Sequence, residues 1–158
     1  QRRIFMKKEK MNDKGFSLVE LIIVIAIMAV LVVVLAPQYL KYVERSRNST
    51  DLQNATAIVT ACQVWAADPT VAADKTFQTG TFDITVTSTG ASVTNPATGQ
   101  NKDAAEAAVA DASITLSEVK CKSKTKWTQY VITGTVNTEG GISFTYGNTD
   151  FASAMAGE

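Results

Sequence analysis

Sixteen consecutive apolar residues, Leu21 to Ala36, constrain the fold of this 158-residue chain more than any other feature. Extending the run back to Phe16 adds only two polar residues, Ser17 and Glu20. About 20 such residues in a helix, each rising about 1.5 Å, span the roughly 30 Å hydrocarbon core of a bilayer. We therefore predict a transmembrane helix in this part of the chain.

The formal net charge of zero is the sum of two unlike parts. Residues 1–15 carry six Lys and Arg against two Asp and Glu, a net charge of +4, and the other 143 residues carry nine against thirteen, a net charge of −4. By the positive-inside rule the basic segment lies in the cytoplasm and residues 38–158 lie outside. The mildly acidic body lacks the basic stripe that nucleic acid requires, so no nucleic-acid partner is predicted.

The chain contains no histidine. This excludes Ser–His and Cys–His nucleophile pairs, imidazole general bases and His-ligated metal sites. Neither the C-x-x-C pattern of redox proteins nor a glycine-rich phosphate loop is found. We expect a protein that is not an enzyme and that needs no cofactor and no metal.

A secretory signal peptide shows the same order of a basic segment and an apolar run. The nearest small-x-small cleavage site is Val34-Leu35-Ala36, and Pro37 immediately after it is a poor cleavage context. The run is also long for the apolar region of a signal peptide. A retained segment is therefore favoured over an ordinary signal peptide.

Glu20 requires an explanation, because a carboxylate well inside a bilayer costs about 2.5–3.5 kcal/mol on insertion scales. An intramembrane acid is a functional hypothesis by default. Ser17-Leu18-Val19-Glu20 is also an S-x-x-E capping box, in which Glu20 would fold back onto the amide of Ser17. From the spacing alone, both explanations stay open.

Residues Lys14 to Glu20, KGFSLVE, place a glycine between the last positive charge and a hydrophobic helix that has glutamate at its fifth position. This arrangement resembles the prepilin signature of type IV pilins and pseudopilins, closely over residues 7 to about 45. The resemblance implies that a membrane-embedded prepilin peptidase cuts after Gly15 and N-methylates Phe16. It also implies that Glu20 meets the terminal amine of Phe16 in a neighbouring subunit, a pairing that would offset both buried charges and set the register.

The start of the precursor is left open between Met6 and Met11. A start at Met6 gives the leader MKKEKMNDKG, which has the short basic character seen in the family. Residues 1–15 are accordingly interpreted as a leader that is removed.

A single helix is expected from Phe16 to about Ala67. Pro37 is interpreted as a bend, since proline is tolerated at the edge of a membrane helix and usually kinks it. Tyr39 and Tyr42 are the expected interfacial aromatics. Beyond them an apolar stripe repeats at helical spacing and is interpreted as core: Leu52, Ala55, Val59, Cys62 and Ala66, widened by Ile58 and Trp65.

The rest of the chain is predicted to form a small head. Within the loop-rich residues 70–102, Phe82, Ile84 and Val86 alternate with polar residues as in a strand. A short helix is predicted over 103–112, followed by an antiparallel meander of strands 114–122, 127–136 and 142–146. The tail from residue 147, with Phe151 and Met155 as packing anchors, is expected over the sheet edge, and terminal disorder is the alternative.

The predicted fold class is therefore α+β. The resemblance implies the type IV pilin fold, a long N-terminal helix packed on a small antiparallel sheet. We divide the chain into a leader (1–15), a transmembrane and polymerisation helix (16–37), an amphipathic half of that helix (38–67) and a globular head (68–158).

Two further features stay open. Cys62 and Cys121 either form a disulfide across the core or remain two buried free thiols. Four lysines surround a predicted hairpin turn; they either project into solvent and protect an edge, or contact acidic neighbours in a filament or an anionic surface. They are Lys120, Lys122, Lys124 and Lys126.

The resemblance implies a structural major pilin, most similar to the Gram-positive, clostridial type, for adhesion, twitching motility or biofilm formation. Its partners would be further copies in a helical homopolymer, the prepilin peptidase, the membrane, and the assembly platform with its ATPases. It would occupy the cytoplasmic (inner) membrane as a precursor and then an extracellular pilus. The alternatives are a pseudopilin of a type II secretion or competence system and a single-pass anchored binding protein that does not polymerise.

Overall fold

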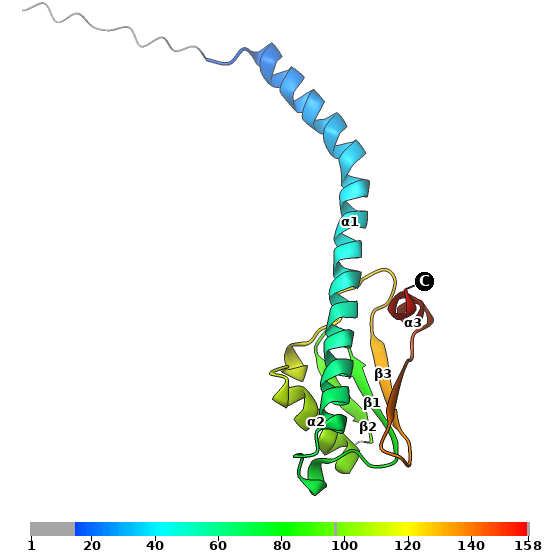
Figure 1. Cartoon of the computed structure of the whole chain (residues 1–158). Helices are drawn as coiled ribbons and strands as arrows, with labels where there is room; N and C mark the ends of the chain where they lie inside the picture. The colour runs from blue at the N-terminus through cyan, green and yellow to red at the C-terminus, as the bar shows by residue number, and fades with distance from the viewer. Residues whose placement is uncertain (1–14, 97, 158) are drawn as a thin grey trace, which may run out of the picture. The chain divides into compact units, whose positions relative to one another are not determined.

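The computed structural model describes residues 15–96 and 98–157, so the predicted leader lies outside the described residues except for Gly15 (Figure 1). The chain divides between Leu40 and Lys41 into two compact units. The predicted α+β class, with a long apolar helix and a small antiparallel sheet, is confirmed. The elements in chain order are α1 (Leu18–Ala67), η1 (Ala73–Lys75), β1 (Gly80–Val86), β2 (Ala91–Asn95), α2 (Gln100–Asp111), η2 (Leu116–Glu118), β3 (Tyr130–Val136), β4 (Ile142–Tyr146) and α3 (Thr149–Ala156).

Helix α1 is 50 residues long and continues without interruption through Pro37. It is long and apolar enough to cross a membrane, with a mean hydropathy of 3.4 over its most apolar 18 residues. Its end is as predicted, because Asp68-Pro69 follows Ala67 and the amide of Asp68 bonds to the Trp65 carbonyl at 3.3 Å. The bend expected at Pro37 stays a prediction.

The sheet has four antiparallel strands in the order β2-β1-β3-β4. Strand β1 is the one predicted from the alternation of Phe82, Ile84 and Val86, and all three are fully buried. The predicted β4 is also present, with Ile142, Phe144 and Tyr146 on its half-buried face. The strand predicted over 127–136 begins only at Tyr130.

Two strand predictions were wrong. Residues 114–122 form no strand: residues 116–118 make a 3-10 turn with local hydrogen bonds, and the amide of Lys122 donates to the Asp51 carboxylate at 2.7 Å. Residues 91–95, which were interpreted as loop, form strand β2 and pair with β1. Its short alternation, with Ala91 and Val93 buried, is hidden among threonine, serine and glycine residues.

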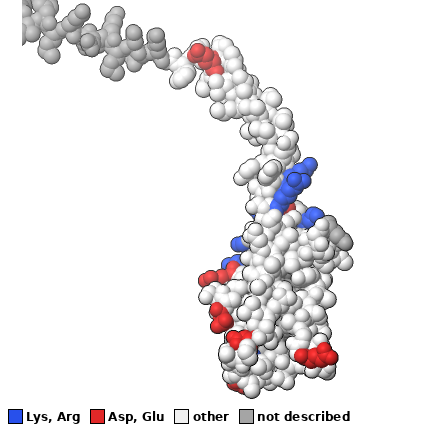
Figure 2. All heavy atoms as spheres, in the orientation of Figure 1, with Lys and Arg blue, Asp and Glu red and all other residues white. Residues whose placement is uncertain are grey.

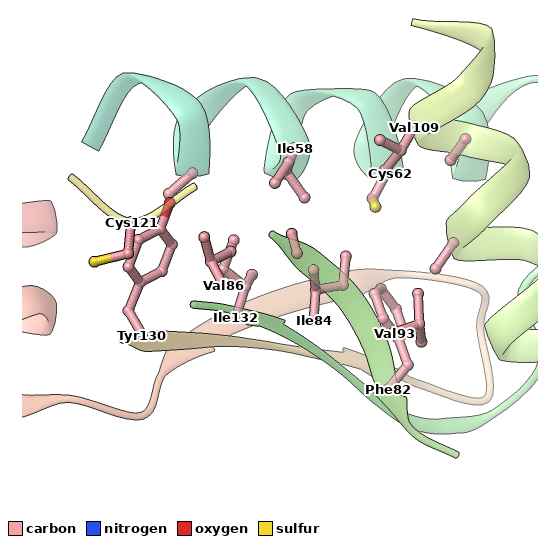
Figure 3. Close-up of a cluster of buried hydrophobic side chains, with 14 of the residues drawn as sticks. Ile58, Cys62, Phe82, Ile84, Val86, Val93, Val109, Cys121, Tyr130 and Ile132 are labelled. Atoms are coloured by element: carbon pink, nitrogen blue, oxygen red, sulfur yellow. The ribbon is translucent and has the colours of Figure 1, made fainter. Parts of the chain in front are cut away.

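The outer half of α1 covers one face of this sheet (Figure 3). The predicted core stripe is largely confirmed, because Ala55, Ile58 and Cys62 are fully buried. Leu52 and Val59, placed in the same stripe, are only partly buried at its margins. The centre of the buried face therefore follows the spacing 55, 58 and 62.

Close packing of β1 on β3 depends on Gly134. This residue lies directly opposite Phe82, and any Cβ added to Gly134 would collide with the Phe82 ring. The ring cannot move aside easily, because it stacks on Phe77 at a centroid distance of 4.9 Å and meets Phe144 edge-on at 6.3 Å. Glycine is the residue that lets the aromatic ring lie across the neighbouring strand.

Two short helices complete the head. Helix α2, predicted over 103–112, runs from Gln100 to Asp111 and buries a face of alanines together with Val109. Helix α3 resolves the open question of the tail, since Asn148 caps it by accepting from the Phe151 amide at 3.2 Å. Phe151 is fully buried and stacks on Tyr130 with a centroid distance of 4.0 Å. The tail therefore packs at the β4 edge, as predicted.

Both cysteines are buried free thiols. Figure 3 shows Cys62 and Cys121 at opposite ends of the core, with Ile58 between them. Cys121 Sγ lies 3.6 Å from an oxygen of Asp51, and Asp51 precedes Cys62 by eleven residues, or about 16 Å of helix. A disulfide needs Cα atoms within about 7 Å, so the alternative of a disulfide between them is excluded.

Candidate assembly site

The predicted cleavage site lies in an extended, open segment before α1. Gly15 and Phe16 are both exposed, and the exposed fraction of Phe16 is 91%. A Cβ added to Gly15 would meet no atom within 4 Å. The fold therefore leaves the peptide bond between these two residues accessible and imposes no packing reason for the glycine.

The capping box is formed at the start of α1. The Ser17 amide donates to Glu20 Oε2 at 2.9 Å, and Ser17 Oγ accepts from the Val19 amide at 3.3 Å. Two amides that a helix N-terminus leaves without partners are thereby satisfied. A carboxylate can accept several hydrogen bonds, so this local role leaves Glu20 able to bind a second donor. The two interpretations left open by the sequence are compatible.

No side chain of the described chain covers the first part of the helix. Every residue from Gly15 to Tyr42 is exposed, and this stretch includes all sixteen residues of the apolar run. An exposed apolar surface of this extent is not stable in water. The helical backbone bonds internally, as a bilayer requires, so lipid or other apolar helices are the environments that fit.

The sequence of this segment was compared with models of protein families. Residues 10–36 match the prokaryotic N-terminal methylation motif, the class III signal peptide of type IV pilins. The motif supports a type IV pilin-like or pseudopilin precursor. The precursor motif includes Gly15, Phe16 and Glu20, and ends with the apolar run at Ala36. It implies processing by prepilin peptidase and insertion into the membrane.

The matched segment is common to type IV pilin-like and pseudopilin precursors, and it does not extend into the head. Neither a curated protein nor a solved structure gave a match to this precursor. The structure of the head itself is therefore the source of any further argument about its role.

Sequence reasoning missed two carboxylates that hold the head of the precursor together. Asp51 is fully buried on α1 and accepts hydrogen bonds from the amides of Lys122 and Ser123 at 2.7 and 2.9 Å. The indole Nε1 of Trp127 donates to it at 2.9 Å. A buried carboxylate without enough donors would be costly, and here backbone and indole N–H groups provide them.

Glu44, two turns earlier on α1, binds the next part of the same loop. Its Oε1 accepts from the amides of Lys124 and Thr125 at 2.7 and 2.9 Å and from Ser123 Oγ at 2.8 Å. Burial raises the pKa of Glu44, but these hydrogen bonds outweigh it and lower the pKa to about 2. We call Glu44, Asp51 and residues 120–127 the carboxylate latch.

A sequence signal for the latch exists. Asp51 stands four residues before Ala55 in the spacing 51, 55, 58 and 62, which is the buried face of α1, and Glu44 precedes it by seven. A carboxylate on an apolar helical face indicates a remote donor. That the donors would be the amides of residues 122–125 could not be predicted, because this region was assigned to a strand and a hairpin turn.

The latch also corrects the interpretation of the four lysines. They lie in an irregular loop that is bound to the helix, and they do not protect a hairpin. The side chains of Lys120, Lys122, Lys124 and Lys126 are exposed. Lys122 and Lys124 bind the carboxylates of the latch through their backbone amides, so the ammonium groups are available for other partners.

Proposed function

We propose that this protein is the major structural subunit of a type IV pilus. Prepilin peptidase would cut after Gly15 and methylate Phe16, and the mature chain would polymerise through residues 16–36 into a surface filament. Its role would be assembly and not catalysis. The pilus would serve adhesion, twitching motility or biofilm formation, as the resemblance implies.

The observation that carries this proposal is the apolar run of α1, which is fully exposed and begins with a methylation motif. Bilayer lipid can cover that surface in the precursor. Outside the membrane, only other apolar helices can cover this surface, and further copies of the same chain provide such helices. Glu20 would then find the amine of Phe16 in a neighbouring copy, which offsets the cost of removing both charges from water.

The first test uses Gly15→Leu in cells that produce the protein. Since a side chain at Gly15 meets no atom within 4 Å, the variant should fold and insert as the wild type does. We expect the wild-type protein sheared from cells to begin at Phe16, heavier by one methyl group, and the variant to remain uncut in the membrane. A wild-type chain that begins before Gly15 or near Pro37 would contradict the proposal.

Electron microscopy of the sheared material then distinguishes the remaining classes. Long, abundant filaments made of this chain are expected. Processing without long filaments would favour a pseudopilin. Unprocessed protein that still functions at the surface would favour an anchored binding protein.

A further inference from the structure

Basic residues of the head are concentrated at one end. The described residues 15–96 and 98–157 contain nine Lys and Arg, and seven of them lie in two short segments, 41–47 and 120–126. The carboxylate latch binds these two segments together, because Glu44 of the first accepts three hydrogen bonds from Ser123, Lys124 and Thr125 of the second. We call the seven side chains the cationic collar: Lys41, Arg45, Arg47, Lys120, Lys122, Lys124 and Lys126.

The collar is exposed and has little charge compensation. All seven side chains are exposed, and within the described chain only Arg47 forms an ion pair, with Glu44 at 3.5 Å. Two carboxylates between these segments, Glu44 and Asp51, accept hydrogen bonds from the loop, and Glu118, two residues before Lys120, is exposed. Figure 2 shows the blue basic side chains gathered over the upper end of the head.

Four of the eleven Asp and Glu residues within 41–96 and 98–157 lie at the other end of the head, together with Lys75 and Lys102. Hydrogen bonds join the segments there: Trp65 Nε1 to the Lys75 carbonyl at 2.9 Å, Gln100 Nε2 to the Ala73 carbonyl at 2.7 Å, and Thr79 Oγ1 to the Asn137 carbonyl at 3.4 Å. These segments carry four exposed carboxylates, which we call the acidic end: Asp68, Asp74, Asp103 and Glu139.

The two ends are separated along α1. Glu44, which marks the collar, and Asp68, which marks the acidic end, are 24 residues apart, or about 35 Å of helix. This exceeds the screening length of about 8 Å at physiological salt several times, so the two ends do not neutralise each other within one head. Two heads side by side at the same level would bring like charges together, whereas an axial displacement of about 35 Å would bring the collar against the acidic end.

We propose that the cationic collar binds the acidic end of a second copy of this chain that is displaced along the filament axis. The contact is heterologous, so it repeats from copy to copy and extends a helical polymer instead of closing a dimer. It would set the axial spacing of the heads, in addition to the apolar packing of α1. The inference rests on the proposed function, because it concerns the same assembly.

The test uses charge reversal in cells that produce the full chain. Lys122→Glu with Lys124→Glu lowers the formal charge of the collar from +7 to +3 (5 − 2) and removes no latch donor, since the backbone amides of both residues make those bonds. Asp74→Lys with Glu139→Lys reverses the acidic end at two exposed positions. Asp111→Lys, a charge change at an exposed position beside residues 57–64 of α1 and outside both ends, is the matched control. Unfolding of each variant is measured in detergent to verify that the head is intact.

We expect each reversal alone to lower the yield of sheared filaments about tenfold, which corresponds to about 1.4 kcal/mol per contact. The combined variant, in which the exchanged positions again carry opposite charges, should recover part of the lost yield, and Asp111→Lys should leave it unchanged. Wild-type filaments should also dissociate more readily as salt rises. Unchanged filaments after either single reversal would overturn the proposal.

Zero-length carbodiimide crosslinking of membranes gives a second readout that does not depend on filaments. A bond between Lys122 or Lys124 and Asp74 or Glu139 can form only between two copies, because within one head Asp51, which binds the Lys122 amide, is 17 residues, or about 25 Å of helix, from Asp68 at the acidic end. If this crosslink does not form, the collar contact is contradicted even if filaments form. If the crosslink forms but no filaments are seen, only the pilus proposal is contradicted. Loss of binding to anionic vesicles on collar reversal, without rescue by the acidic-end reversal, would assign the collar to lipid headgroups and contradict a second copy.

Discussion

The two halves of α1 each contain a carboxylate on a largely apolar helix, but the surroundings of the two acids differ. Glu20 lies where every side chain is exposed, and its hydrogen bond comes from Ser17, three residues away. Asp51 lies in a closed core, and its donors come from residues more than 70 positions along the chain. The first half is thus shaped for partners outside the chain and the second for partners within it.

Substitution of the two acids should therefore affect different measurements. Glu20→Ala is expected to abolish filaments, because each subunit in the assembly would retain an unpaired terminal ammonium in an apolar environment. Cleavage after Gly15 and the unfolding of the head should be unchanged. Filament counts by electron microscopy, N-terminal sequencing and unfolding in detergent measure the three quantities.

Ser17→Ala is the matched control for this variant, since it removes one member of the capping box and retains the carboxylate. Filaments should form with Ser17→Ala. If Ser17→Ala removes filaments as completely as Glu20→Ala, then helix capping alone explains Glu20, and the comparison between the two halves fails.

Asp51→Ala should produce the opposite pattern. It leaves the amides of Lys122 and Ser123 and the Trp127 indole without their acceptor in a buried place, and we expect a loss of about 3–5 kcal/mol of unfolding free energy. Denaturant unfolding of the full chain in detergent, followed by tryptophan fluorescence, measures it. Membrane insertion through the apolar run should persist.

Asp51→Asn provides the finer comparison, because it keeps the shape and one acceptor oxygen but places an NH₂ group against donors. It should be destabilised, though less than Asp51→Ala. A change within about 0.5 kcal/mol for both variants would mean that the loop is held without the carboxylate.

The same contrast explains what the sequence could and could not predict. The backbone hydrogen bonds of residues 16–36 are local, and almost all of the side chains are apolar. The helix, its cap and the membrane segment could therefore be predicted from Ser17, Glu20 and the apolar run. Strands β1 and β4 followed from alternation alone. In residues 114–122 the alternation changes phase between Leu116 and Val119, and residues 116–118 form a 3-10 turn with local hydrogen bonds. From Lys122 the conformation depends on Asp51, about 70 positions away, and no local pattern contains that information.

The sequence predicts which residues are buried better than it predicts which buried residues lie next to each other. The face of α1 could be predicted from its period, whereas the separation of Cys62 and Cys121 depends on the level at which the loop meets the helix. Strand β2 was also not predicted, since Ala91-Ser92-Val93 is a weak strand signal. Helix α3 was not predicted either, because Asn148 can be identified as its cap only once Phe151 is known to be buried.

Glu44 offers the smallest and most specific test, because it belongs to the latch but lies at its exposed margin. Its pKa is lowered to about 2 from an ordinary value of 4.5 by the hydrogen bonds from the loop. A depressed carboxyl pKa contributes stability that is complete above pH 4.5 and is lost as pH falls through 2. Full protonation should cost about 1–2 kcal/mol, less than the value of about 1.4 kcal/mol per pKa unit would give, because solvent screens a charge at the exposed margin of the latch.

The measurement is the unfolding free energy of wild type and Glu44→Gln between pH 7 and pH 2. The difference between the two proteins should be largest at neutral pH and should shrink as the pH falls below 4.5, because wild-type Glu44 then loses its charge. Glu139→Gln, in an exposed turn, should keep the wild-type pH dependence. A constant difference between wild type and Glu44→Gln would show that the Glu44 charge does not hold the loop, and that Asp51 alone distinguishes the second half of α1 from the first.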